Sequence, residues 1–132
     1  MGTRLRSTRT QRKDSGRSDA AAVRIAAVQM ASGPRVESNL KEAAWLIETA
    51  VEQGAKLVAL PEYFGIMGMK DTDKVAVREE FGKGPIQEFL SETAKKHGIW
   101  IVGGSVPLVA ASPKKVMNTS LVYDDKGKIG RA

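Results

Sequence analysis

The chain has 132 residues, of which 42% are hydrophobic and 27% are charged, with a formal net charge of +6. These values are typical of one soluble globular domain that can bury a core. Cysteine is absent, which excludes disulfides, thiolate metal sites and a cysteine nucleophile within this sequence. No run of apolar residues is long enough for a transmembrane helix, and no apolar secretory segment lies near the N-terminus. We therefore expect a cytoplasmic location.

The positive charge lies mainly in the first part of the chain. Residues 1–22 hold six basic and two acidic residues, whereas the remainder holds 15 basic and 13 acidic residues. The segment is rich in Arg, Ser and Thr and has little to bury, so we predict a disordered tail. A nucleic-acid arm would have interleaved aromatic residues, a transit peptide would be poor in acids, and a lipid anchor would not have Arg6. We expect no nucleic-acid partner and no membrane partner, and a domain over residues 23–132.

Strand and helix patterns alternate from residue 23 onwards. Residues 23–30 are predicted to form a strand, and apolar residues at helical spacing predict a helix over residues 40–51. The continuous apolar run 57–60 predicts a strand that is buried on both faces. A strand, a helix and a strand with short connections form a βαβ unit, so the two strands should be parallel with a right-handed crossover.

The second half of the chain continues this α/β pattern. Residues 61–84 form a long, glycine-containing segment that we interpret as a pocket wall or lid. Residues 85–97 predict a second helix, with Pro85 at its favoured first position. His97, the only histidine, lies near its C-terminus, where the helix dipole suits an imidazole without any catalytic role. The remaining sequence predicts strands at 99–105 and 117–123, a tight turn at 124–128 and a fifth strand from Ile129.

Glu62 is the candidate functional residue. Pro61 ends the buried strand because it has no amide proton for a sheet, and Glu62 follows at the carboxyl end of that strand. Ligands of open α/β sheets bind beyond this end, and a partly desolvated carboxylate there can act as a general base. Position alone favours an ordinary loop acid over a base, because a general base requires a geometry that the sequence does not show. We place Tyr63 and Phe64, the next two residues, as substrate-binding residues, and we expect no metal and no cofactor.

The landmarks together resemble the nitrilase, or carbon–nitrogen hydrolase, superfamily. The resemblance extends from residue 23 to the end. Within the superfamily, the run Phe64-Gly65-Ile66-Met67-Gly68 is similar to the branch that contains amidases of deaminated glutathione and ω-amido acids. The segments that carry the resemblance are Arg24-Ile25-Ala26-Ala27-Val28-Gln29-Met30, Asn39-Leu40, Gly54-Ala55-Lys56-Leu57-Val58-Ala59-Leu60-Pro61-Glu62-Tyr63-Phe64, Gly84-Pro85, Gly103-Gly104-Ser105, Asn118-Thr119-Ser120-Leu121-Val122-Tyr123 and Asp125-Lys126-Gly127.

The resemblance implies a fold and a chemistry. The fold would be the N-terminal half of an αββα sandwich, with a mixed sheet, βαβ units and two covering helices, and the full-length protein would be a homo-oligomer. The reaction would be hydrolysis of a small amide, an ω-amido acid or a nitrile by a Glu-Lys-Cys triad, without metal or cofactor. Glu62 would be the general base that deprotonates the cysteine, and the lysine would stabilise the oxyanion.

The sequence departs from the family pattern because Glu62 is the only one of the three catalytic residues present. The lysine is expected just beyond Arg131-Ala132, and Lys126 and Lys128 belong to the turn. We therefore expect a chain truncated before the lysine and cysteine and inactive alone. Two alternatives stay open. One is a non-catalytic α/β binding module with a basic N-terminal arm; the other is a homologue that kept the scaffold and lost the chemistry.

Overall fold

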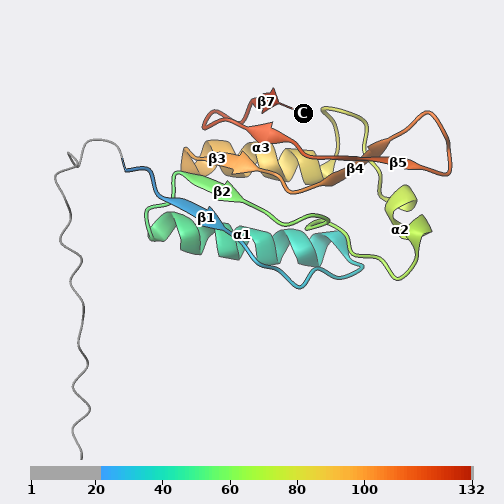
Figure 1. Cartoon of the computed structure of the whole chain (residues 1–132), viewed down its shortest axis with the longest axis horizontal. Helices are drawn as coiled ribbons and strands as arrows, with labels where there is room; N and C mark the ends of the chain where they lie inside the picture. The colour runs from blue at the N-terminus through green and yellow to red at the C-terminus, as the bar shows by residue number, and fades with distance from the viewer. Residues whose placement is uncertain (1–21, 132) are drawn as a thin grey trace, which may run out of the picture.

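The computed structural model describes residues 22–131 and has a mixed α/β fold (Figure 1). The predicted disordered tail therefore lies, apart from residue 22, outside the described residues. The elements in chain order are β1 (Ile25–Ala27), α1 (Val36–Glu52), β2 (Leu57–Ala59), α2 (Asp71–Ala76), α3 (Pro85–His97), β3 (Trp100–Val102), β4 (Val106–Val109), β5 (Val116–Thr119), β6 (Val122–Tyr123) and β7 (Ile129–Arg131).

The main sheet has five strands in the order β1-β2-β3-β6-β7, and β4 and β5 form a separate two-stranded sheet. Strands β1, β2 and β3 are parallel, whereas β6 and β7 are antiparallel to their neighbours. The first βαβ unit is present as predicted, and a second connects β2 to β3 through α3. The expected mixed sheet is therefore confirmed.

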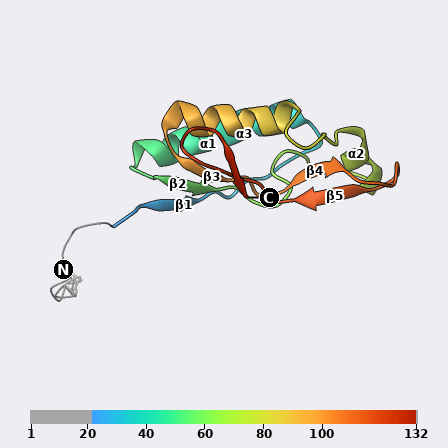
Figure 2. The same ribbon diagram turned by 90° about the horizontal axis from the view of Figure 1, so that it is seen from above.

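Helices α1 and α3 lie side by side on one face of the five-stranded sheet (Figures 1 and 2). Val58 and Ile101 in the central strands are fully buried in a core with Ile47 of α1 and Leu90 of α3. Side chains alternate between the two faces of a strand, so the residues next to Val58 and Ile101 point to the opposite face. The expected pair of covering helices is confirmed, and both cover the same side.

Local sequence signals explain the ends of α3. Pro85 occupies its first turn, and Gly98 ends it in the left-handed conformation at φ 60°. The buried carboxylate of Glu79 caps its N-terminus, accepting hydrogen bonds from the backbone N–H groups of Ile86 at 2.7 Å and Gln87 at 3.1 Å. These caps place α3 at the residues that the sequence predicts.

The predicted single strand over residues 117–123 is wrong. The chain leaves the small sheet after β5 and enters the main sheet at β6, where β6 pairs with β3. Strand β5 pairs instead with β4, which the sequence analysis did not predict. Between β5 and β6 the carbonyl of Leu121 accepts a hydrogen bond from the Gly103 N–H at 2.7 Å. Residues 117–123 are divided because β6 pairs with β3, where Val122 lies opposite Val102, and a local pattern does not reveal such a partner.

Candidate functional site

Glu62 lies beyond the carboxyl end of β2, the strand between β1 and β3. The pairing continues past the strand, because the N–H of Leu60 donates to the carbonyl of Val102 at 2.9 Å. The carboxyl ends of three parallel strands therefore meet at this edge, which is where α/β sheets bind ligands. The side chain of Glu62 is exposed among the described residues, in contrast to the expected partial desolvation.

The carboxylate of Glu62 has one side-chain hydrogen-bond partner within residues 22–131. The side-chain amide of Asn118 donates a hydrogen bond to Oε1 of Glu62 at 2.9 Å. Asn118 lies in β5, opposite Pro107 of β4. The β4–β5 hairpin therefore contacts the candidate base directly, although it is a separate sheet.

Tyr63 has an unusual backbone conformation next to Glu62. Its φ is 54°, a left-handed value that non-glycine residues rarely adopt. Its N–H donates to Oγ of Ser105 at 2.8 Å, and its ring lies beneath the ammonium of Lys74, 3.6 Å from the ring centroid. Both contacts come from residues later in the chain, Lys74 in α2 and Ser105 after β3, and together they hold Tyr63 in place beside the carboxylate.

Phe64 lies in the core instead of at the surface. Its side chain is fully buried, and its ring centroid is 6.4 Å from that of Phe89. A substrate cannot touch this ring in the present conformation. Of the two expected substrate-binding residues, Tyr63 alone has side-chain surface available beside Glu62.

The connection between β1 and α1 fixes the segment that follows Glu62. Oγ of Ser32 donates to the Phe64 carbonyl at 2.8 Å. The buried side chain of Asn39 donates to the carbonyls of Gly33 at 2.8 Å and Gly65 at 3.0 Å, and it accepts from the Gly33 N–H at 2.8 Å. Asn39 therefore joins the start of α1 to the Glu62 loop.

Gly104 allows the chain after β3 to pass against this loop. Its φ is 54°, and a Cβ atom at this position would lie 2.0 Å from the carbonyl oxygen of Pro61. No side chain fits such an approach to a backbone atom. Gly104 thus lies against Pro61, the residue that precedes Glu62.

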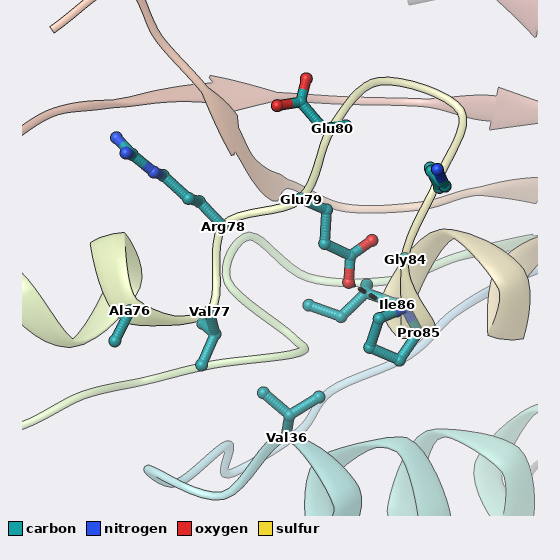
Figure 3. Close-up of a pocket in the computed structure, with 10 residues that line it drawn as sticks. Val36, Ala76, Val77, Arg78, Glu79, Glu80, Gly84, Pro85 and Ile86 are labelled. Carbon is teal, nitrogen blue, oxygen red and sulfur yellow. Dashed lines mark hydrogen bonds between the residues drawn. The ribbon is translucent and has the colours of Figure 1, made fainter. Parts of the chain in front are cut away.

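A pocket of about 460 Å³ lies at one end of the helical layer, between the start of α1, the segment after α2 and the start of α3 (Figure 3). Val36, Val77 and Ile86 contribute apolar walls. Figure 3 shows that the Glu79 carboxylate points toward the start of α3, where it caps the helix. The segment 61–84 therefore does line a pocket, but Glu62 is not among the lining residues.

The other residues considered in the sequence, His97, Lys126 and Lys128, occupy structural positions in a helix end and a turn. His97 is the half-buried last residue of α3. The backbone N–H groups of Lys126 and Lys128 each donate to Oδ1 of Asp124 at 2.9 Å, as expected for a turn. These two bonds hold the pKa of the Asp124 carboxyl below its usual value. Residues 22–131 contain no cluster of three or more His, Cys, Asp or Glu side chains suited to a metal ion.

None of the helices between residues 22 and 131 is both long and apolar enough to cross a membrane.

Sequence reasoning missed Asn118, Ser105 and Asn39 as parts of the site. Each lies in a segment that carried the family resemblance, and each is a polar residue beside apolar ones. That signal could have marked them as hydrogen-bonding residues. Their partners beside Glu62 are Gly65, Tyr63 and Glu62 itself, which lie 26, 42 and 56 positions away in sequence, so only the folded chain identifies them.

The chain is similar to known proteins both in sequence and in three-dimensional structure. The carbon-nitrogen hydrolase family model matches residues 24–132. The chain is 35% identical to nitrilase homolog 2 of Dictyostelium discoideum over 80% of its own length, and 36% identical to a deaminated glutathione amidase of Synechocystis over 78%. The crystal structure of Saccharomyces cerevisiae Nit3, a member of branch 10 of the nitrilase superfamily, superimposes with a TM-score of 0.65 at 32% identity, covering 74% of this chain.

The chain spans about a third of the length of these relatives, since it covers 32% of the Dictyostelium protein, 38% of the Synechocystis protein and 38% of Nit3. Within that span the fold agrees with the resemblance identified in the sequence. The chain therefore belongs to the carbon-nitrogen hydrolase family.

Proposed function

We propose that this chain supplies the general base, Glu62, of an enzyme that hydrolyses a small amide. The observation that supports this most directly is the position of Glu62: it follows the central parallel strand and faces outward, with one oxygen held by Asn118. For the second carboxylate oxygen, Oε2, residues 22–131 provide no recorded hydrogen-bond partner. An exposed oxygen with a fixed neighbour is suited to accept a proton from an incoming thiol.

The proposed reaction passes through a thioester. Glu62 takes the proton of a cysteine thiol, and the thiolate attacks the amide carbon. The C–N bond then breaks, and the leaving NH2 group takes the proton from Glu62 and departs as ammonia. Water then hydrolyses the thioester to a carboxylic acid and restores the thiol. The present sequence has no cysteine, so the thiol, and the lysine that stabilises the oxyanion, would be supplied by residues outside it.

The proposed substrate is an ω-amide of a small carboxylic acid. The support is the similarity to proteins named deaminated glutathione amidase, in Synechocystis, and omega-amidase, in Xenopus laevis, at 36% identity each. In this proposal Tyr63 forms part of the substrate-binding surface, because its side chain lies next to the base. Phe64 supports that surface from the core.

The test of this function is ammonia release from a panel of ω-amides by the intact protein that contains this chain and the cysteine. Glu62→Gln keeps the shape of the side chain and removes the base, so we expect kcat to fall by about 100-fold or more. Glu48→Gln, at an exposed position of α1, is the matched control and should leave kcat unchanged. Full activity of Glu62→Gln would refute the role of Glu62.

A companion experiment uses the 132-residue chain alone. We expect no ammonia release from any ω-amide, because no acyl-enzyme can form without a thiolate. Turnover by the purified chain that disappears in Glu62→Gln would show a different, cysteine-free mechanism.

A further inference from the structure

We infer that Asn118 is a positioning residue for Glu62, and this inference rests on the function proposed above. The β4–β5 hairpin would then orient the catalytic base as well as support the fold. The juxtaposition that carries the inference is the 2.9 Å hydrogen bond between Nδ2 of Asn118 and Oε1 of Glu62, which joins residues 56 positions apart.

The chemistry of the two groups fixes the direction of this hydrogen bond. An ionised carboxylate only accepts hydrogen bonds, so the NH2 group of Asn118, and not its carbonyl oxygen, must face Glu62. The bond holds Oε1 and leaves Oε2 available for a proton.

The backbone around both residues restricts their movement. Asn118 sits in a strand whose register pairs it with Pro107. The chain enters that hairpin through Ser105, whose Oγ accepts the N–H of Tyr63 at 2.8 Å. The hairpin therefore contacts the Glu62 loop twice, once at its side chain and once at the next backbone amide. Two contacts define an orientation that one contact would leave free to rotate.

The burial and the bonding partner of each residue assign a separate role to each contact. Ser105 is buried and binds only backbone, so it serves the shape of the turn. Asn118 is exposed at the same edge and binds the functional group itself. Removing the amide of Asn118 should therefore disturb Glu62 with little effect on folding, whereas removing Ser105 should disturb both.

Nuclear magnetic resonance of the 132-residue chain tests the geometry without requiring activity. In the unsubstituted chain, the side-chain amide resonances of Asn118 should shift as the pH is lowered from 7 to 3, since the carboxylate that they contact becomes protonated. In Glu62→Gln this pH-dependent shift should disappear. In Asn118→Leu the Glu62 side chain should change from one rotamer to an average of several, while Met117→Leu, an exposed neighbour in β5, should change neither signal.

Kinetics of the intact enzyme test the consequence for catalysis. Asn118→Leu should lower kcat by about 10- to 100-fold with KM within about twofold, because the base is misplaced but the substrate surface is kept. Asn118→Gln, which keeps an amide at this position, should retain part of the rate, and the control Met117→Leu should keep the full rate. The inference would be refuted by an unchanged kcat in Asn118→Leu. It would also be refuted by Asn118 resonances that respond to pH in the same way in Glu62→Gln as in the unsubstituted chain. If the inference about Asn118 is refuted in this way but Glu62→Gln still loses activity, the proposed function of Glu62 remains supported. Failure of the inference and failure of the proposed function are therefore distinguishable.

Discussion

Asn39 carries the tightest polar network among the residues that shape the site. Its buried side chain makes three hydrogen bonds to the backbone of two segments, Gly33 and Gly65. Asn39→Ala leaves these buried groups without partners, so we expect the free energy of unfolding to fall by about 2 to 4 kcal/mol. Urea unfolding followed by circular dichroism measures it. The control, Lys41→Ala, removes only an exposed ion pair with Glu37 and should change stability by less than about 0.5 kcal/mol.

Tyr123 should make the stability of the chain depend on alkaline pH. Its hydroxyl is buried without a hydrogen-bond partner among the described residues, and burial, with the Glu79 carboxylate as a smaller cause, raises its pKa to about 12. An unfolded tyrosine ionises near pH 10, so the neutral side chain contributes its full stability below about pH 10. That contribution is lost as the pH rises through about 12.

The substitution that tests this dependence is Tyr123→Phe. Urea unfolding at several pH values between 7 and 12 should show a fall in the free energy of unfolding above about pH 10, and the variant should show less of it. At pH 7 the variant should be as stable as the unsubstituted chain or more stable by up to about 1 kcal/mol, because an unpaired buried hydroxyl is removed. Tyr63→Phe serves as the control. An identical fall in Tyr123→Phe would contradict the assignment.

At the scale of elements, the close contact between the β3–β4 connection and the loop after β2 fixes the position of Glu62. The β3–β4 connection passes against Pro61 at Gly104, where both the positive φ and the contact exclude a side chain. Gly104→Ala should therefore destabilise the chain by about 3 kcal/mol or more and weaken the Asn118–Glu62 hydrogen bond.

Two glycines separate the causes of this effect. Gly82 has a φ of 80° with open space around it, so Gly82→Ala should show the conformational strain alone, about 1 kcal/mol. Gly33 has no positive φ and nothing within 4 Å, so Gly33→Ala should change stability by less than about 0.5 kcal/mol. Thermal unfolding of the three variants measures the differences. Equal losses in Gly104→Ala and Gly82→Ala would show that the loop contact is unimportant.

At the scale of the whole molecule, one face of the main sheet carries none of the helices formed by residues 22–131. Ile25, Leu57 and Trp100 lie in one row across β1, β2 and β3, and Ile25 and Trp100 are 68% and 44% exposed. Apolar rows of this kind favour association with another protein surface. The two helices shield the opposite face, which makes the apolar surface one-sided (Figure 2).

We therefore expect the 132-residue chain to self-associate through this face. Trp100→Lys places a charge in the row and should shift the sedimentation profile toward monomer. Trp45, which is 64% exposed on α1, offers a matched control, because Trp45→Lys changes an equally large aromatic residue on the helical side. A monodisperse monomer at micromolar concentration, before any substitution, would contradict the prediction.

The sequence by itself determined the elements whose causes are local. Helix α3 is specified by Pro85 at its start and Gly98 at its end, and strand β2 before Pro61 is specified by a continuous apolar run. The predicted burial of that strand on both faces is wrong for residues 22–131, because Val58 is buried under the helices whereas Leu57 and Ala59 on the other face are only half-buried. Glu62 is the candidate base because of its position after that strand together with the family resemblance, and both are features of the sequence.

Only the tertiary structure decided which distant groups meet at the site. The division of residues 117–123 between two sheets, the burial of Phe64 and the contact of Asn118 with Glu62 all depend on segments separated by many residues. Such contacts depend on how strands pair and how loops cross, and a strand's own pattern does not specify its partner. The candidate base is therefore visible in the sequence, whereas the groups that orient it appear only when the chain is folded.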